Sequence, residues 1–398
     1  MKKQILTMFI IFILAVAIEV LAFFVINENK RKHRLKIEPE LINVINLKLE
    51  VDTKVDLKEL LKRDYNEKIE TREIGKKTLA LKTDNEKFSY LINYDVVDST
   101  PPLIKGSSTY TVTKGKSVAL ENIFLCGDYY DANPKRTVEG DYNLDKTGSY
   151  NLTYIAEDSS GNKSTKDFTL KVVNPSSSSS SSSVKRDSIS VFADKHKKDG
   201  AKIGIDVSTW QGNINWQKAK DDGVEFAMIR IGFGHNSDNE MVLDNKFERN
   251  IEEAKKVGMP IGVYFYSYAK TKEEAIEQAK WIVEKLNGEK LDLPISFDWE
   301  EWSKFNTYNV SFRGLTEIAQ AFIDEVEKNG YQGSLYSSAY YLNNIWGNID
   351  NTWLAYWTDN NDYEKPFNMW QVGIGKVNGI GEVDIDILYD QTQNKKTP

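Results

Sequence analysis

The stretch GVYFYSYAKTKEEAIEQAKWIVEKLNGEKLDLPISFDWE, residues 262–300, decides the fold of the C-terminal half of this chain. It begins and ends with short apolar, aromatic-rich runs that are typical of buried strands, at 260–268 and 294–299. Its middle, residues 271–287, has the spacing of an amphipathic helix. A strand, a helix and a second strand in this order predict a β/α unit with parallel strands.

The same alternation continues on both sides of this unit. Eight strands are expected, at residues 203–207, 226–232, 260–268, 294–299, 333–338, 353–357, 369–372 and 383–388. Helices are expected at residues 245–257, 271–287 and 312–328, and only a short one at 341–346. Because the gaps shorten after the fifth strand, we predict a TIM-like, helix-poor β/α barrel over residues 201–398.

Four carboxylates stand at strand ends or within the last strand, where barrel enzymes carry their catalytic groups. Asp206 ends the first strand, Asp298 and Glu300 end the fourth, and Asp384 lies in the eighth. Asp298 and Glu300 are two residues apart and so project to the same side. Asp206 and Asp384 meet if the barrel closes. Crowding and desolvation would raise at least one carboxyl pKa, as a general acid requires.

Side chains that suit a sugar lie near the same ends. These candidate substrate-binding residues are Tyr264, Tyr266, Tyr336, Trp357, Trp370 and Gln371. Any one of the four acids could equally be a surface carboxylate, whereas four at one barrel end indicate a glycosidase site.

Six motifs in fixed order carry a family resemblance. They are GIDVSTWQGNINW (204–216), GVYFYSYA (262–269), PISFDWEEW (294–302), WLAYW (353–357), MWQ (369–371) and VDIDIL (383–388). Together they resemble glycoside hydrolase family 25, the Chalaropsis-type lysozymes. The resemblance implies a muramidase that cleaves the β-1,4 bond between N-acetylmuramic acid and N-acetylglucosamine in the glycan strands of peptidoglycan, with no metal or cofactor.

The resemblance also implies roles for the acids. Glu300 would be the acid/base, Asp298 would orient the substrate's N-acetyl group, and Asp206 and Asp384 would complete the cluster. Substrate-assisted retention is preferred, because two acids on one strand cannot flank the sugar from opposite faces. The family's usual Asp-x-Asn is Asp384-Ile385-Asp386 here, so either aspartate could face the pocket; we favour Asp384.

An apolar run at residues 5–26 is long enough to span a bilayer as a helix. Ala15-Val16-Ala17 is similar to a signal-peptide cleavage site, which would release a secreted protein, but the run continues beyond it and favours an uncleaved anchor over residues 1–36. Basic residues are more numerous after the run than before it, which favours a cytoplasmic C-terminal part. Since long domains translocate regardless and the substrate is cell wall, we expect a single-pass protein with its catalytic domain extracytoplasmic.

Between anchor and barrel, short alternating runs predict two small all-β, immunoglobulin-like sandwiches, at 37–98 and 99–174. GSYNLTYIAEDSSGNKS, residues 148–164, resembles bacterial immunoglobulin-like repeats of surface proteins. These domains could be spacers or could bind wall or protein partners; a spacer is the preferred interpretation. The serine run within 175–200 predicts a flexible linker.

Composition argues against several classes of protein function. The net charge of −7 with scattered Lys and Arg offers no footprint for nucleic acid. Cys126 is the single cysteine, and no Cys or His spacing fits a metal site, which argues against zinc amidases and Cys/His peptidases. The alternative function is a non-catalytic wall-binding protein or adhesin.

Overall fold

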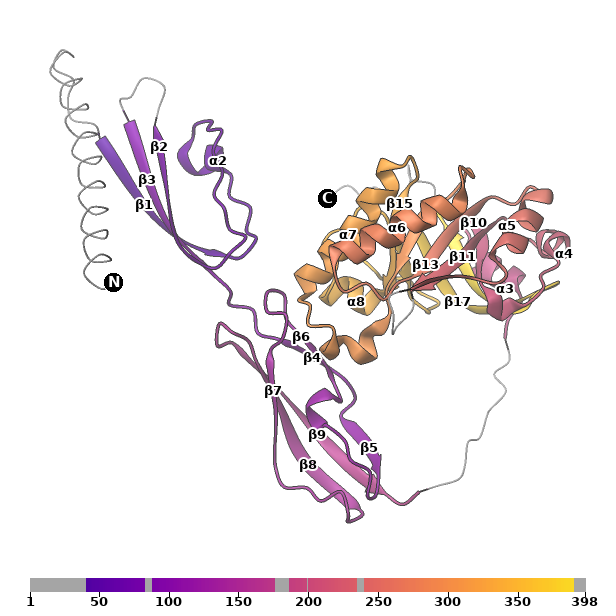
Figure 1. Ribbon diagram of the computed structural model, residues 1–398, viewed down its shortest axis with the longest axis horizontal. Helices are drawn as coiled ribbons and strands as arrows, with labels where there is room; N and C mark the ends of the chain where they lie inside the picture. The colour runs from indigo at the N-terminus through magenta and orange to yellow at the C-terminus, as the bar shows by residue number, and fades with distance from the viewer. Residues whose placement is uncertain (1–40, 83–87, 176–185, 199, 235–239, 390–398) are drawn as a thin grey trace, which may run out of the picture. The chain divides into compact units, whose positions relative to one another are not determined.

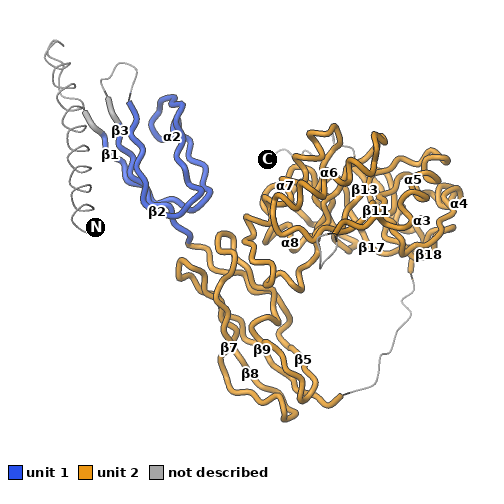
Figure 2. The backbone as a smooth tube through the Cα atoms, viewed as in Figure 1, with its two compact units in different colours: residues 1–98 blue, residues 99–398 orange. Residues whose placement is uncertain are grey.

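The computed structural model describes residues 41–82, 88–175, 186–198, 200–234 and 240–389. The chain separates into two compact units, residues 1–98 and 99–398 (Figure 2). The expected membrane segment at 5–26 lies outside the described residues. Within the described ranges, no helix is both long and apolar enough to cross a bilayer.

The first unit contains one three-stranded sheet. Its elements are β1 (Leu41–Glu50), α2 (Leu57–Leu61), β2 (Gly75–Lys82) and β3 (Phe88–Val97). β3 lies in the middle, parallel to β1 and antiparallel to β2. The prediction of an immunoglobulin-like sandwich at 37–98 is therefore wrong for the described residues, because a sandwich needs two facing sheets. The long connection from β1 to β3, which includes α2 and β2, allows the parallel pairing instead.

Residues 103–173 form the predicted second sandwich. Its elements are β4 (Leu103–Lys105), β5 (Thr109–Thr113), η1 (Leu120–Asn122), β6 (Leu125–Gly127), β7 (Lys135–Glu139), β8 (Gly148–Glu157) and β9 (Lys163–Val173). One sheet has the order β5-β9-β8-β7, and β4 pairs with β6 in the other. Leu152 and Tyr154 alternate inward and pack with Phe124 and Phe168 in a shared core. This immunoglobulin-like prediction is confirmed.

The C-terminal domain closes into a barrel. Its strands are β10 (Lys202–Val207), β11 (Phe226–Gly234), β12 (Met241–Leu243), β13 (Ile261–Tyr266), β14 (Ile295–Asp298), β15 (Gly333–Ser338), β16 (Thr352–Ala355), β17 (Met369–Val377) and β18 (Gly381–Leu388). The order β10-β18-β17-β16-β15-β14-β13-β11, with β10 also paired to β11, closes the ring, and β12 is appended to β11. All eight expected strands are present.

The last strand departs from a regular β/α barrel. β18 runs antiparallel to both β17 and β10. Only three residues separate β17 from β18, which is too short for a crossover helix and long enough for a hairpin. Gly379 in this turn has φ 88°, a conformation that favours glycine.

Helices cover the outside of the barrel (Figure 1). They are α3 (Ile189–His196), α4 (Trp216–Asp221), α5 (Phe247–Lys256), α6 (Lys272–Leu286), α7 (Phe312–Lys328) and α8 (Ala339–Asn344). Two short 3-10 helices, η2 (Thr209–Gln211) and η3 (Glu301–Thr307), follow β10 and β14. The apolar stripe of α7 is buried, including Leu315, Phe322 and Val326. The linker boundary at 175–200 needs correction, because α3 packs on the barrel through His196, whose ring meets the ring of Trp370 at 5.0 Å.

The barrel interior is filled by a small cluster of Phe226, Met228, Trp353 and Met369. Gly204 on β10 permits this packing, since a Cβ there would lie 2.6 Å from the Phe226 ring. This cluster fills the middle of the barrel. One pocket opens at the carboxyl ends of the parallel strands, where barrels of this class carry their active sites, and a second lies at their amino ends, lined by residues that include Leu293 and Asn351.

Candidate active site

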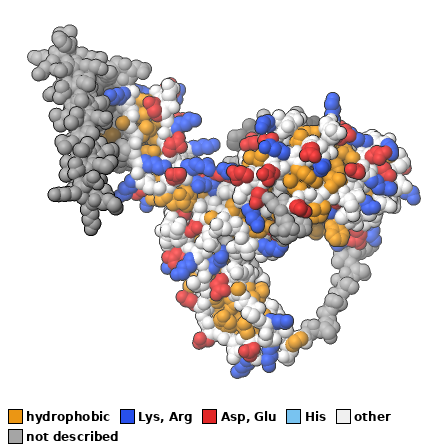
Figure 3. All heavy atoms as spheres, viewed as in Figure 1, with side chains coloured by type: hydrophobic (Ala, Val, Ile, Leu, Met, Phe, Trp, Pro, Cys, Tyr) orange, Lys and Arg blue, Asp and Glu red, His pale blue; other side chains and the backbone are white. Residues whose placement is uncertain are grey.

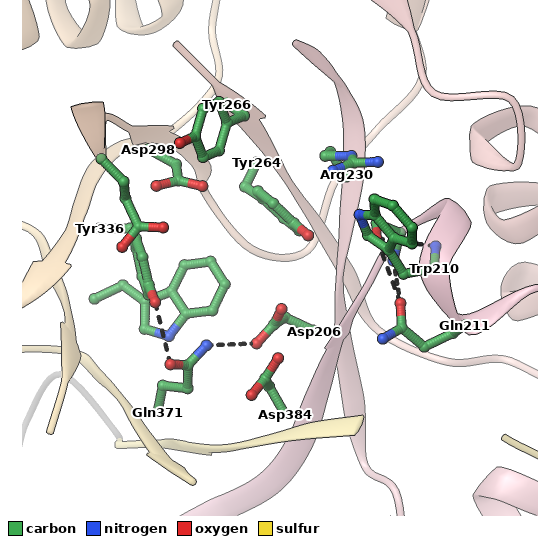
Figure 4. Close-up of a pocket in the computed structure, with 13 residues that line it drawn as sticks. Asp206, Trp210, Gln211, Arg230, Tyr264, Tyr266, Asp298, Tyr336, Gln371 and Asp384 are labelled. Carbon is green, nitrogen blue, oxygen red and sulfur yellow. Dashed lines mark hydrogen bonds between the residues drawn. The ribbon is translucent and has the colours of Figure 1, made fainter. Parts of the chain in front are cut away.

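One pocket at the carboxyl ends of the barrel strands gathers most of the predicted site residues (Figure 4). It is lined by Asp206, Ser208, Trp210, Gln211, Arg230, Tyr264, Tyr266, Asp298, Glu300, Tyr336, Trp353, Gln371 and Asp384. All four predicted acids are in this set, as are four of the six residues predicted to bind substrate. Among the described residues of the barrel, the carboxylate oxygens of these acids are not close enough to one another for three of them to hold one metal ion.

Strand register brings the acids together. Asp206 on β10 and Asp384 on β18 are direct cross-strand partners, and Figure 4 shows their carboxylates facing each other. Asp298 is the last residue of β14, and Glu300 follows two positions later at the start of η3. Both acids line the pocket, but the prediction that Glu300 also ends the strand needs correction, because β14 stops at Asp298 and Glu300 reaches the pocket from the start of η3.

The acids differ in exposure. Asp206 and Asp298 are buried, whereas Glu300 lies at the mouth of the pocket and is more exposed than either. Oδ1 of Asp298 is buried and has no hydrogen-bond donor among the described residues. A buried carboxylate oxygen without a donor is costly, unless a bound molecule supplies the missing N–H or O–H group.

Burial and mutual repulsion shift the acids toward their protonated forms. Burial and then the Asp384 charge raise the pKa of Asp206 to about 8. Burial raises the pKa of Asp384 to about 6, which Arg186 opposes. The pKa of Glu300 is raised mainly by loss of hydration and further by the charge of Asp384. The pKa of Asp298 is raised mainly by burial and further by the charge of Glu300. The cluster therefore holds protons at neutral pH, as a general acid requires.

Gln371 orders one wall of the pocket. Its Nε2 donates to Oδ2 of Asp206 at 2.8 Å, and its Oε1 accepts from Tyr336 Oη at 3.1 Å and from Trp357 Nε1 at 3.0 Å. These three bonds use the amide in one orientation and link the aromatic wall to the acids.

Asp386 lies beneath the pocket. It projects to the same side of β18 as Asp384 but is fully buried, and its Oδ1 accepts from Trp353 Nε1 at 2.8 Å. Burial and the neighbouring Asp206 raise the pKa of Asp386 well above its ordinary value. Of the two alternatives, Asp384 is the residue that lines the pocket, as favoured from the sequence.

Several lining residues were not identified from the sequence. Trp210 in η2 lies at the rim of the pocket and is 83% exposed. Its segment is held by Asp244, whose Oδ2 accepts from Thr209 N at 3.0 Å and from Arg230 Nε at 2.8 Å. Trp210 lies within the motif GIDVSTWQGNINW, so its position after the first strand was the available signal.

Two predicted substrate-binding residues lie elsewhere. Trp370 is buried, and its Nε1 donates to the carbonyl of Tyr356 at 2.7 Å. Because strand side chains alternate, Gln371 faces the pocket and Trp370 faces α3 on the outside, so the prediction for Trp370 is wrong. Trp357 is 58% exposed and contacts the site through Gln371, although it does not line the pocket.

The face of the molecule in Figure 3 shows no patch of a single charge, because Lys and Arg are interspersed with Asp and Glu. Such mixing produces no large field of one sign.

Comparisons with known proteins agree with the immunoglobulin-like domain and with the barrel. A family model described as glycosyl hydrolases family 25 matches residues 205–375, and one described as bacterial surface protein, Ig-like domain, matches 102–172. The uncharacterized protein YegX of Escherichia coli K12 is 30% identical over 200 residues, covering 46% of this chain and 68% of that protein. Lysozyme M1 of Streptomyces globisporus is 39% identical over 64 residues, covering 16% and 20%.

A solved structure is also similar. It is the modular autolysin LytC of Streptococcus pneumoniae in complex with a synthetic peptidoglycan ligand, at 22% identity and a TM-score of 0.43. The similarity covers 60% of this chain, and this chain spans 56% of LytC.

Proposed function

Because this chain belongs to glycosyl hydrolase family 25 and is a glycoside hydrolase, we propose that its pocket cleaves the β-1,4 bond between N-acetylmuramic acid and N-acetylglucosamine in peptidoglycan. The observation that carries the proposal is the convergence of Glu300 with Asp206, Asp298 and Asp384 in one pocket. The raised pKa of Glu300 keeps a proton available at the mouth, where a glycosidic oxygen can reach it.

Glu300 and Asp298 take direct parts in a substrate-assisted reaction. Glu300 donates its proton to the leaving glycosidic oxygen while the substrate's own acetamido oxygen bonds to the anomeric carbon. The donor-free Oδ1 of Asp298 accepts the acetamido N–H and so holds this group in line. Glu300 then takes a proton from the water that attacks the anomeric carbon, which breaks the bond to the acetamido oxygen and retains the configuration.

A glycan chain also needs a surface to lie on. The exposed ring of Trp210 and the partly buried rings of Tyr264, Tyr266 and Tyr336 border the acids. Flat rings pack against the faces of sugars, while Gln371 and the tyrosine hydroxyls supply polar partners.

A single substitution tests the catalytic role. Glu300→Gln preserves shape but removes the proton donor, so hydrolysis of purified wall should fall by about 10²–10⁴-fold. Glu327→Gln, on the exposed face of α7, is the matched control and should keep full activity. Equal clearing by wild type and Glu300→Gln in a zymogram, or none from either, contradicts the proposal.

The bond is identified by the products. Mass spectrometry of muropeptides released by the wild type should show N-acetylmuramic acid at the reducing end. Reducing-end N-acetylglucosamine would assign a different bond.

We also propose that residues 5–26 anchor the chain and that the hydrolase acts on the cell-wall side, with peptidoglycan as its partner. Support comes from the apolar run and from the substrate assigned above. Intact cells treated with an external protease should lose the catalytic domain from membrane fractions. Protection of that domain in intact cells would place it inside.

A further inference from the structure

The immunoglobulin-like domain contacts the segment that carries Glu300. This segment, η3, begins at the residue after Glu300. Asn306 near its end accepts from Cys126 N at 2.9 Å through Oδ1 and donates to the Phe124 carbonyl at 2.8 Å through Nδ2. One side-chain amide thus pairs with both a donor and an acceptor of the backbone around β6, as a neighbouring strand would.

A second contact joins the residue after β6 to the start of α7. The N–H of Phe312, in the first helical turn, donates to the carbonyl of Asp128 at 2.8 Å. Amides of the first turn have no partner within their own helix, so the immunoglobulin-like domain satisfies this one. Gly127 lets the two domains approach, because a Cβ there would lie 2.4 Å from the Phe312 ring and 2.5 Å from the Phe305 ring.

A third contact runs through stacked rings. The ammonium of Lys105 on β4 lies 3.8 Å from the ring centroid of Tyr340 and 3.9 Å from that of Tyr341. Tyr341 stacks on Trp302 with centroids 3.8 Å apart and planes at 13°. Trp302 is only two residues from Glu300, so a chain of direct contacts leads from the immunoglobulin-like domain to the catalytic segment.

The interface has an apolar part as well. Leu103 on β4 and Leu125 on β6 pack against the hydrophobic core of the barrel. A domain that serves only as a spacer needs no such contacts with its neighbour, and interdomain motion is the expectation where they are few. The contacts instead concentrate on η3, the first turn of α7 and the start of α8, and Tyr341 of α8 stacks on Trp302 of η3.

We propose that the immunoglobulin-like domain positions the catalytic residue of the barrel. It holds η3, and through η3 it holds Glu300 in the geometry for proton transfer. Asn306 is the positioning residue. The inference rests on the catalytic role proposed for Glu300. It replaces the preferred sequence interpretation of this domain as a spacer.

Two substitutions in the full chain test this inference. Asn306→Ala removes both amide hydrogen bonds from the barrel side, and Gly127→Ala separates the surfaces from the immunoglobulin-like side. Asn151→Ala, on the exposed face of β8, is the control. Initial rates of new reducing ends are measured on soluble, uncross-linked glycan strands at varied concentration, and hydrogen exchange is followed in the peptide containing residues 300–308.

Misplacing Glu300 slows the reaction without removing the surface that binds glycan. We therefore expect kcat to fall about tenfold or more in both variants, because small misplacements of catalytic groups have effects of this size. KM should change by less than about twofold, and exchange in 300–308 should rise. The control should match the wild type in all three measurements.

The outcomes separate the two proposals. An active wild type with kcat within twofold in Asn306→Ala overturns the positioning role, as does a change confined to KM. If Asn306→Ala fails to fold, Gly127→Ala decides by the same criteria. A wild type without activity on glycan strands refutes the proposed function instead, whereas the exchange measurement still reports whether the domain holds η3.

Discussion

Replacing the buried Asp386 by asparagine should stabilise the protein increasingly as pH rises. The side chain is 0% exposed and accepts a hydrogen bond from Trp353 Nε1 at 2.8 Å, and its protonated carboxyl donates a hydrogen bond to Asp206. Asparagine has the same shape, can accept from the indole and can donate to Asp206, but it carries no titrating group. The substitution therefore isolates the effect of holding a proton on a buried acid.

The sign follows from linkage. The folded state raises the pKa of Asp386 well above its ordinary value, so below about pH 4 both states hold the proton and the group has no effect on stability. As pH rises further, the unfolded chain releases the proton and the folded chain keeps it. The folded state then loses about 1.4 kcal/mol per pH unit until its own pKa is reached.

Between pH 4 and pH 7 this slope sets a ceiling of about 4 kcal/mol, and we expect a gain of about 1–3 kcal/mol for Asp386→Asn at pH 7, because burying an amide has its own desolvation cost. Urea unfolding of the barrel, followed by tryptophan fluorescence at pH 4, 5.5 and 7, measures the difference. Asp350→Asn, at an exposed position, is the control. A difference between Asp386→Asn and wild type that stays constant from pH 4 to pH 7 would refute the reasoning.

Three further changes test other parts of the site. Asp384→Asn removes a charge that raises the pKa of Glu300, so the alkaline limb of kcat/KM should move to lower pH; an unmoved limb would show that burial alone sets it. Arg230→Met breaks the 2.8 Å pair with Asp244, whose side chain is 0% exposed, and should lower the free energy of unfolding by about 3–5 kcal/mol in thermal or urea melts; a loss under 1 kcal/mol would contradict this. Trp210→Ala should raise KM for glycan strands severalfold while kcat stays within about twofold, and a loss confined to kcat would argue against a binding role.

The strands of the barrel and the identity of the acids could be predicted from the sequence, because both depend on local patterns. Apolar runs mark each strand, and the two-residue spacing of Asp298 and Glu300 places them on one side without knowledge of the fold. The proximity of Asp206 and Asp384 was predicted from the number of strands, because the first and eighth strands are neighbours in a closed barrel. Trp370 was misassigned because adjacent residues in a strand face opposite ways, and composition does not say which way is inward.

The tertiary structure alone decided how the parts act on one another. Which face of β18 meets the pocket, and that Asp386 lies below Asp384 against Asp206, depends on the antiparallel register of the last hairpin. The raised pKa values depend on desolvation, which exists only once the barrel closes. The contact of Asn306 with β6 joins residues that are 180 positions apart. No local sequence pattern predicts such a contact between two domains, because it forms only when both surfaces are already folded.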